Sequence, residues 1–180
     1  CYSSDASLHV AGNGGSGVVI IRIPRTAYVP VASGIVMSGG ASATYVGDGT
    51  NGVLNQPYVT HTFTGSGTLT VSQFDADKEC DILLVGGGGG GGALYPGGGG
   101  GAGGMLSLSS ARLPTGSVSV VVGAGGAAGA LASNVGGQGG HSSIGDYIVP
   151  GGGGGGGYQG YAIPAGNGGS GGGVGGGAYY

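Results

Sequence analysis

The chain has 180 residues, of which 53 are glycine and only 6% are charged, and its formal net charge is −3. Glycine at this level without a Gly-X-Y period excludes collagen, and 39% hydrophobic residues with so little charge exclude a disordered polyelectrolyte. The scattered basic residues form no stripe that would bind the phosphates of a nucleic acid, and no apolar run approaches the roughly 20 residues that a membrane-spanning helix needs.

The predicted elements are strands. Continuous apolar runs, as in Val18 to Ile21 and Ile82 to Val85, predict strands that are covered on both faces, and alternation predicts half-buried strands elsewhere. The expected strands, in chain order, cover residues 18–21, 43–46, 58–64, 68–72, 82–85, 105–108, 117–122 and 147–149. Residues 65–67, Gly-Ser-Gly, have the length of a hairpin connection. No segment has helical spacing, and each glycine costs a helix about 1 kcal/mol relative to alanine, so we expect essentially no helix.

Long glycine runs separate these strands, at Gly86–Gly92, Gly97–Gly101 and Gly151–Gly157, with shorter ones at 123–126, 136–140 and 171–177. A helix of the polyproline II type has no internal hydrogen bonds, so its peptide groups point outward. Glycine helices of this type can therefore stack as rods and hydrogen-bond to each other. The predicted fold class is all-β, a short-stranded β-sandwich with a glycine-rich layer of polyglycine II type; loosely ordered loops are the alternative.

The order of strands and glycine runs from His61 to Gly157 resembles the glycine-rich domain of phage tail-fibre proteins and of surface proteins of environmental bacteria. The resemblance covers roughly residues 58–177. It implies an extracellular protein, or one at a cell or virion surface. In that family the domain closes with a segment like 14–22, which lies here at the N-terminus, and joining Tyr180 to Cys1 would restore the family order.

The heptapeptide Ala11–Gly17 recurs unchanged at residues 165–171. We therefore divide the chain into a donor strand or end of a preceding repeat (1–24), a connecting β segment (25–57) and a glycine-rich β domain (58–180). The chain is then one period of a tandem array, or each subunit donates its first strand to a neighbour's sheet. The third interpretation is that this strand folds into its own domain.

The candidate polymerisation strand is apolar on both faces. Its residues are Val18, Val19, Ile20, Ile21 and Ile23. Each would contribute on the order of 1.5–3 kcal/mol when buried in a neighbour. Because donor and acceptor surfaces differ, the contact would grow an open filament.

Other candidate contacts concern cysteine and tyrosine. Cys1 and Cys80 form a candidate disulfide, and the alternatives for Cys1 are a lipid-modified terminus or a bond to a neighbouring subunit. Tyrosines that interrupt or end the glycine tracts are candidates for contact with a receptor or with another subunit. They are Tyr95, Tyr158, Tyr161, Tyr179 and Tyr180.

No chemistry-bearing pattern emerges. His9, His61 and His141 match no metal-ligand spacing. The acidic residues Asp75, Asp77, Glu79 and Asp81 would share one face of an extended strand, which favours a solvated edge over a calcium site. No phosphate-binding loop or catalytic constellation is present, so we expect no enzyme, no cofactor and no metal.

These observations predict a structural subunit of an extracellular filament whose partners are copies of itself. The alternative is a phage tail-fibre adhesin that binds a cell-surface glycan or protein receptor through loops on the glycine layer.

Overall fold

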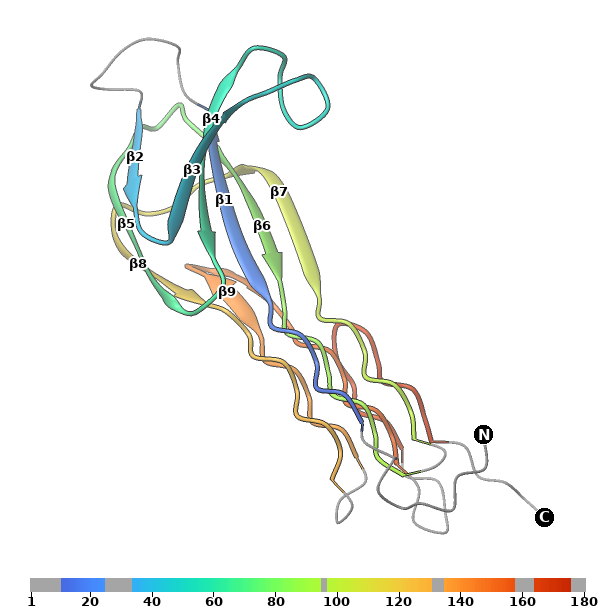
Figure 1. The fold of residues 1–180 in the computed structure, drawn as a ribbon. Helices are drawn as coiled ribbons and strands as arrows, with labels where there is room; N and C mark the ends of the chain where they lie inside the picture. The colour runs from blue at the N-terminus through green and yellow to red at the C-terminus, as the bar shows by residue number, and fades with distance from the viewer. Residues whose placement is uncertain (1–10, 25–33, 95–96, 131–134, 158–163, 176–180) are drawn as a thin grey trace, which may run out of the picture.

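The computed structural model describes residues 11–24, 34–94, 97–130, 135–157 and 164–175 (Figure 1). The molecule is elongated, with two β-sheets at one end and a bundle of extended glycine-rich segments at the other. The described residues contain no helix. The predicted all-β class is therefore confirmed.

Every strand expected from the sequence is present, and two others, β2 and β9, were not expected. The strands are β1 (Val18–Pro24), β2 (Ile35–Ser38), β3 (Ala41–Val46), β4 (Pro57–Phe63), β5 (Gly67–Phe74), β6 (Cys80–Val85), β7 (Met105–Ala111), β8 (Gly116–Val121), β9 (Ser142–Ile144) and β10 (Tyr147–Val149). Both unexpected strands are short, and β9 contains only one apolar residue, so neither produces a periodic pattern.

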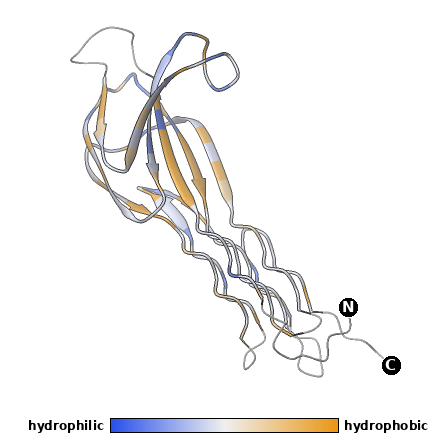
Figure 2. Cartoon of the chain, in the orientation of Figure 1, coloured by the Kyte–Doolittle hydropathy of each residue, from blue (hydrophilic) through white to orange (hydrophobic). Residues whose placement is uncertain are grey.

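The strands form two antiparallel sheets that pack face to face. Sheet A has the order β3-β4-β1-β6-β7, and sheet B has the order β10-β9-β8-β5-β2. Their inner faces supply fully buried apolar side chains, including Ile21 and Leu84 from sheet A and Leu69 and Ile144 from sheet B. The apolar stretches of the strands are visible in Figure 2. This arrangement confirms the predicted β-sandwich.

Strand β1 lies in the centre of sheet A, between β4 and β6 of the same chain. Ile21 is opposite His61 on one side and Ile82 on the other. Within the single chain, the place of the closing strand is therefore filled, and strand donation by a neighbour stays a prediction. The N-terminal segment fills that place itself, because its apolar side chains continue the inner face of the sheet.

The central strands are covered on one face, not on both as the sequence predicted. In β1 the inward side chains of Val19 and Ile21 are buried, whereas Val18 and Ile20 on the outer face stay partly exposed. Strand β6 shows the same alternation. The outer face of sheet A thus carries apolar residues on its two middle strands.

The predicted hairpin at residues 65–67 is also wrong. Strand β4 belongs to sheet A and β5 to sheet B, so this connection crosses from one sheet to the other. Both sides of β4 are already occupied, by β1 and by β3.

The segments 1–24, 25–57 and 58–180 do not fold apart in the described residues, because each contributes strands to the same sandwich.

Neighbouring strands of each sheet lead into the glycine-rich segments, which lie side by side (Figure 1). We call these segments R1 (residues 11–17), R2 (86–94), R3 (97–104), R4 (122–130), R5 (135–141) and R6 (150–157), and together with residues 164–175 the glycine layer. R1, R2 and R3 continue β1, β6 and β7 of sheet A, and R4, R5 and R6 continue β8, β9 and β10 of sheet B.

Candidate functional site

The glycine layer is held by backbone hydrogen bonds that repeat every third residue. R2 shows this most completely, because each of its amides from Gly86 to Gly92 donates to a neighbouring segment at 2.8–2.9 Å. Gly86, Gly89 and Gly92 donate to R3, Gly87 and Gly90 to R5, and Gly88 and Gly91 to R1. A helix with about three residues per turn aims its amides in three directions in this way.

The same spacing recurs in the other segments. Gly98, Gly101 and Gly104 of R3 donate to R6, while Gly137 and Gly140 of R5 donate to R4. The described part of the layer therefore has the polyglycine-II-like order that the sequence predicted, and the alternative of loosely ordered loops is wrong for these residues.

Close packing of the segments requires glycine. All residues of R6 from Gly151 to Gly157 are buried. A Cβ atom built on Gly90 would lie 1.9 Å from the Ala127 carbonyl oxygen, and one on Gly154 would lie 1.9 Å from that of Gly136. Such distances are far below van der Waals contact, so no side chain fits between these rods.

Ser142 joins the sandwich to the glycine layer. Its side chain is fully buried, its hydroxyl accepts a hydrogen bond from the Gly123 amide at 2.9 Å, and it donates one to the Val85 carbonyl at 2.7 Å. One hydroxyl thus satisfies two backbone groups at the points where β6 and β8 end. Sequence reasoning missed this role, since the segment His141-Ser142-Ser143 carries no pattern that indicates it.

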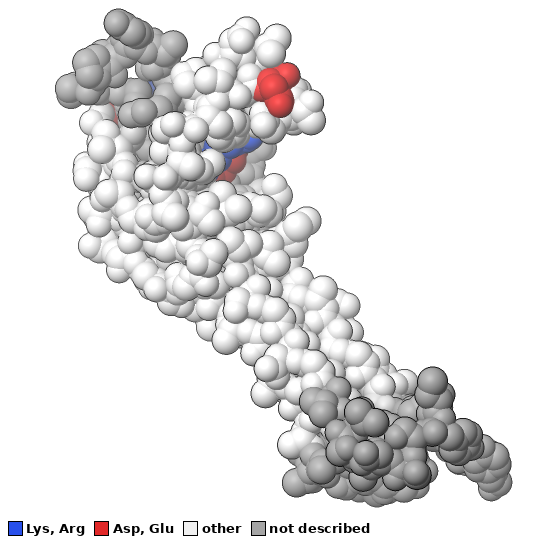
Figure 3. All heavy atoms as spheres, in the orientation of Figure 1, with Lys and Arg blue, Asp and Glu red and all other residues white. Residues whose placement is uncertain are grey.

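The glycine layer carries no charge. R1 to R6 and residues 164–175 contain no Lys, Arg, Asp or Glu, and in Figure 3 the charged side chains lie on the sandwich. Ionic contacts therefore play no part in holding the rods together.

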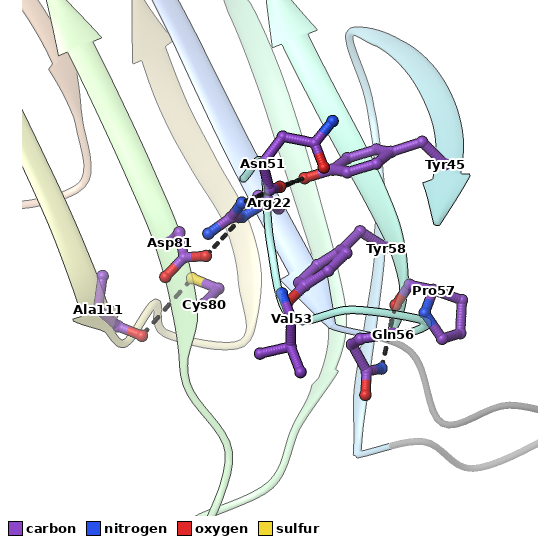
Figure 4. A network of polar contacts seen from close by, with 10 residues as sticks. All are labelled: Arg22, Tyr45, Asn51, Val53, Gln56, Pro57, Tyr58, Cys80, Asp81 and Ala111. Atoms are coloured by element: carbon purple, nitrogen blue, oxygen red, sulfur yellow. Dashed lines mark hydrogen bonds and ion pairs between the residues drawn. The ribbon is translucent and has the colours of Figure 1, made fainter. Parts of the chain in front are cut away.

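A polar network lies on the outer face of sheet A (Figure 4). The Arg22 Nε donates to the Asp81 carboxylate at 2.6 Å, and its Nη1 donates to the Tyr45 hydroxyl at 3.1 Å and to the Asn51 carbonyl at 2.8 Å. Hydrogen bonding to Tyr45 and pairing with Asp81 raise the pKa of Arg22 above its ordinary value. The guanidinium also lies 4.8 Å from the ring centre of Tyr58.

This network holds the loop between β3 and β4 against the sheet. Tyr45 stacks on Tyr58 with a centroid distance of 5.3 Å, and the Tyr58 hydroxyl accepts from the Val53 amide at 3.0 Å. A shallow pocket of about 500 Å³ adjoins it, and its lining includes Val53, Asp77 and Lys78. The hydrogen bonds of the network link Asn51 and Val53 of this loop to Arg22 of β1 and Tyr58 of β4, which indicates a role in positioning the loop.

The four acidic residues do not share one face of an extended strand, because residues 75–79 form a turn before β6. Asp81 pairs with Arg22 instead, and Asp77 pairs with Lys78. That contact lowers the pKa of Asp77. In the described part of the chain no three metal-binding side chains gather, and no helix is long and apolar enough to span a membrane.

The histidines do not come together. His61 is buried in β4, with its Nδ1 2.9 Å from the Gly39 carbonyl oxygen. His141 is exposed directly before β9, where R5 meets the sandwich, and His9 lies outside the described residues.

Cys80, one half of the candidate disulfide, is a free thiol buried in the sandwich core. Cys1 lies outside the described residues, and so do the candidate contact residues Tyr95, Tyr158, Tyr161, Tyr179 and Tyr180. The polymerisation-strand residues, by contrast, form the middle of sheet A.

A family model described as "Glycine-rich domain" matches residues 62–180, from the end of β4 through the glycine layer. The chain belongs to this family. Strand β1 and R1 lie outside the matched residues, although they complete sheet A and the layer of this glycine-rich domain. Comparisons with curated proteins and with solved structures gave no match.

Proposed function

We propose that this glycine-rich domain is a structural, non-enzymatic subunit of an extracellular filament. The observation that supports this function most directly is the three-residue hydrogen-bond repeat that joins R1 to R6. Rods bonded on several sides make a stiff unit, and an uncharged layer creates no repulsion between copies. Stiffness and self-association are the properties that a filament subunit needs.

We further propose that subunits join by exchanging residues 11–24. This segment forms the central strand of sheet A, yet it is connected to β2 only through residues 25–33. A neighbour's segment would make the same contacts with β4 and β6, so exchange would alter little in enthalpy. Under the tandem-repeat alternative, covalent connection between successive units replaces exchange.

A disulfide that ties β1 to β6 of the same chain tests strand exchange. Ile20 is opposite Leu83, and both side chains are on the outer face of sheet A. The variant Ile20→Cys/Leu83→Cys, in a Cys1→Ser background, is oxidised as a monomer and inspected by negative-stain electron microscopy. We expect fibres from the reduced protein and from the Cys1→Ser control, and isolated particles from the oxidised protein.

Fibres of equal length from the oxidised and reduced proteins would overturn exchange but leave the filament in place. Discrete particles from every variant, over the concentrations at which extracellular fibres form, would overturn the filament itself.

A phage tail-fibre adhesin is the second candidate function. R2 and R3, R4 and R5, and R6 and residues 164–169 form three antiparallel pairs, and each pair has two described ends at the side of the layer away from the sandwich. Three pairs of rod ends on one side suit the presentation of a binding surface for a host-surface glycan or protein. Binding of the purified chain to intact cells, without fibre formation, would favour this function.

A further inference from the structure

One side of R2 has backbone carbonyls that accept no hydrogen bond from the described part of the chain. R2 donates to R1, R3 and R5, and it accepts from R4 at Gly88 and Gly91 and from R6 at Gly87 and Gly90. The third set of positions in the three-residue repeat is different: the carbonyls of Gly86, Gly89 and Gly92 accept no hydrogen bond from an amide of the described residues. A rod with about three residues per turn aims these three carbonyls in one common direction.

That direction lies between R1 and R3. A Cβ atom built on Gly88 would have as its nearest atoms the Gly15 nitrogen of R1 at 3.5 Å and the Gly101 oxygen of R3 at 3.8 Å. Each flanking segment also has amides that donate to nothing in the described part of the chain. They are Gly12 and Gly15 in R1, and Gly100 and Gly103 in R3.

The result is a groove of backbone along R2, which we call the open groove. Its floor offers carbonyls at Gly86, Gly89 and Gly92, and its walls offer unpaired amides, in each case three residues apart. R2 is surrounded by R1, R4, R5, R6 and R3, in that order. The side between R3 and R1 holds no rod of the described residues. A further rod placed here would complete the ring of neighbours.

We infer that the open groove binds a glycine-rich segment of a second copy of this chain. A polyglycine-II-like rod matches this three-residue repeat. Every third amide of such a rod would donate to the R2 carbonyls, and its carbonyls would accept from the amides of R1 and R3 on either side. The chain itself supplies such a segment: residues 171–174 lie outside R6 and R3, and the amides of Gly171 and Val174, three residues apart, have no partner among the described residues. The groove and the segment that enters it are different surfaces, so the contact propagates.

This inference rests on the proposed self-assembly and names a contact surface for it. It differs from strand exchange, because the groove is open while β1 occupies its own sheet. The two contacts therefore respond to different substitutions.

The test uses Gly88→Ala, with Gly99→Ala as the matched control. The Gly88 methyl group meets only ordinary contacts within the chain but projects into the open groove. A Cβ on Gly99 has no atom within 4 Å and borders the solvent side of R3. In ¹⁵N-labelled protein, the amide signals of Gly12, Gly15, Gly100 and Gly103 are followed as the chain concentration is raised. Thermal unfolding of both variants verifies that each is folded.

We expect the four amide signals to shift with concentration in the unmodified chain and in Gly99→Ala, and the shifts to be lost in folded Gly88→Ala. Concentration-independent signals in the unmodified chain would overturn the inference, and so would equal shifts in folded Gly88→Ala. A shift on addition of acetyl-hexaglycine amide, but none with chain concentration, would overturn the second copy as occupant. Fibres that persist in folded Gly88→Ala, together with the concentration-dependent shifts of the four amides, would refute the groove and leave the filament standing.

Discussion

Burial changes the chemistry of Cys80. Its side chain is 1% exposed, and its thiol lies 3.5 Å from the Ala111 carbonyl oxygen, which accepts its weak hydrogen bond. Removal from water, aided by the charge of Asp81, raises the pKa of Cys80 from the ordinary 9.0 to about 12. The thiol is therefore neutral and inert in the folded chain at neutral pH.

This pKa predicts how stability depends on pH. The folded value exceeds the unfolded one, so the contribution of Cys80 is fully present below pH 9.0 and is lost as the pH rises towards 12, where the unfolded chain has already released its proton. Urea denaturation between pH 8 and pH 11 should show a steeper decline in the free energy of unfolding for the unmodified chain than for Cys80→Ala. If the two proteins show identical slopes, the decline comes from the ionisation of tyrosine and lysine instead.

Single residues were the least predictable part of this molecule from sequence. Arg22 stands out as the one charge within an apolar strand, but its partners Asp81 and Tyr45 become neighbours only through the pairing of β1 with β6 and of β3 with β4. Ser142 bonds to Val85 and Gly123 across the junction of two sheets. Such roles depend on topology, which no local pattern contains.

The rods, as elements, should tolerate substitution at some glycines and not at others. Gly154 is buried in R6 with no room for a Cβ, so Gly154→Ala should destabilise the chain by about 1–3 kcal/mol or more through overpacking. Gly99→Ala meets no atom and should be neutral or stabilising, by up to about 1 kcal/mol, because it restricts the unfolded chain. Thermal and denaturant unfolding measure both; equal effects would contradict the packed layer.

Strands and rods were largely predictable because each has a local period, of two residues or of three. Their pairing was not. Gly65-Ser66-Gly67 has hairpin length but connects two sheets, and the heptapeptide at residues 11–17 is straight whereas its copy at 165–171 bends at 168–170. The identical residues hydrogen-bond to different rods, so neighbours decide their path.

The whole molecule depends on residues 11–24, which contribute to the sandwich and to the glycine layer. Their removal would leave β4 and β6 without a common partner, and the amides of Gly88 and Gly91 without acceptors. From the structure we expect loss of the folded state, measurable as loss of dispersed amide signals and of a cooperative melt. A deletion variant that melts cooperatively would contradict this coupling.

The all-glycine interior of R6 also bears on the response to temperature. Unfolding a hydrophobic core exposes apolar surface, which raises the heat capacity, whereas exposure of peptide groups lowers it. The buried stretch Gly151–Gly157 exposes almost nothing but peptide groups when it opens. The layer therefore offsets part of the heat-capacity increment of the sandwich and flattens the stability curve, so the chain loses less of its stability on cooling than a domain of equal size built around side chains alone.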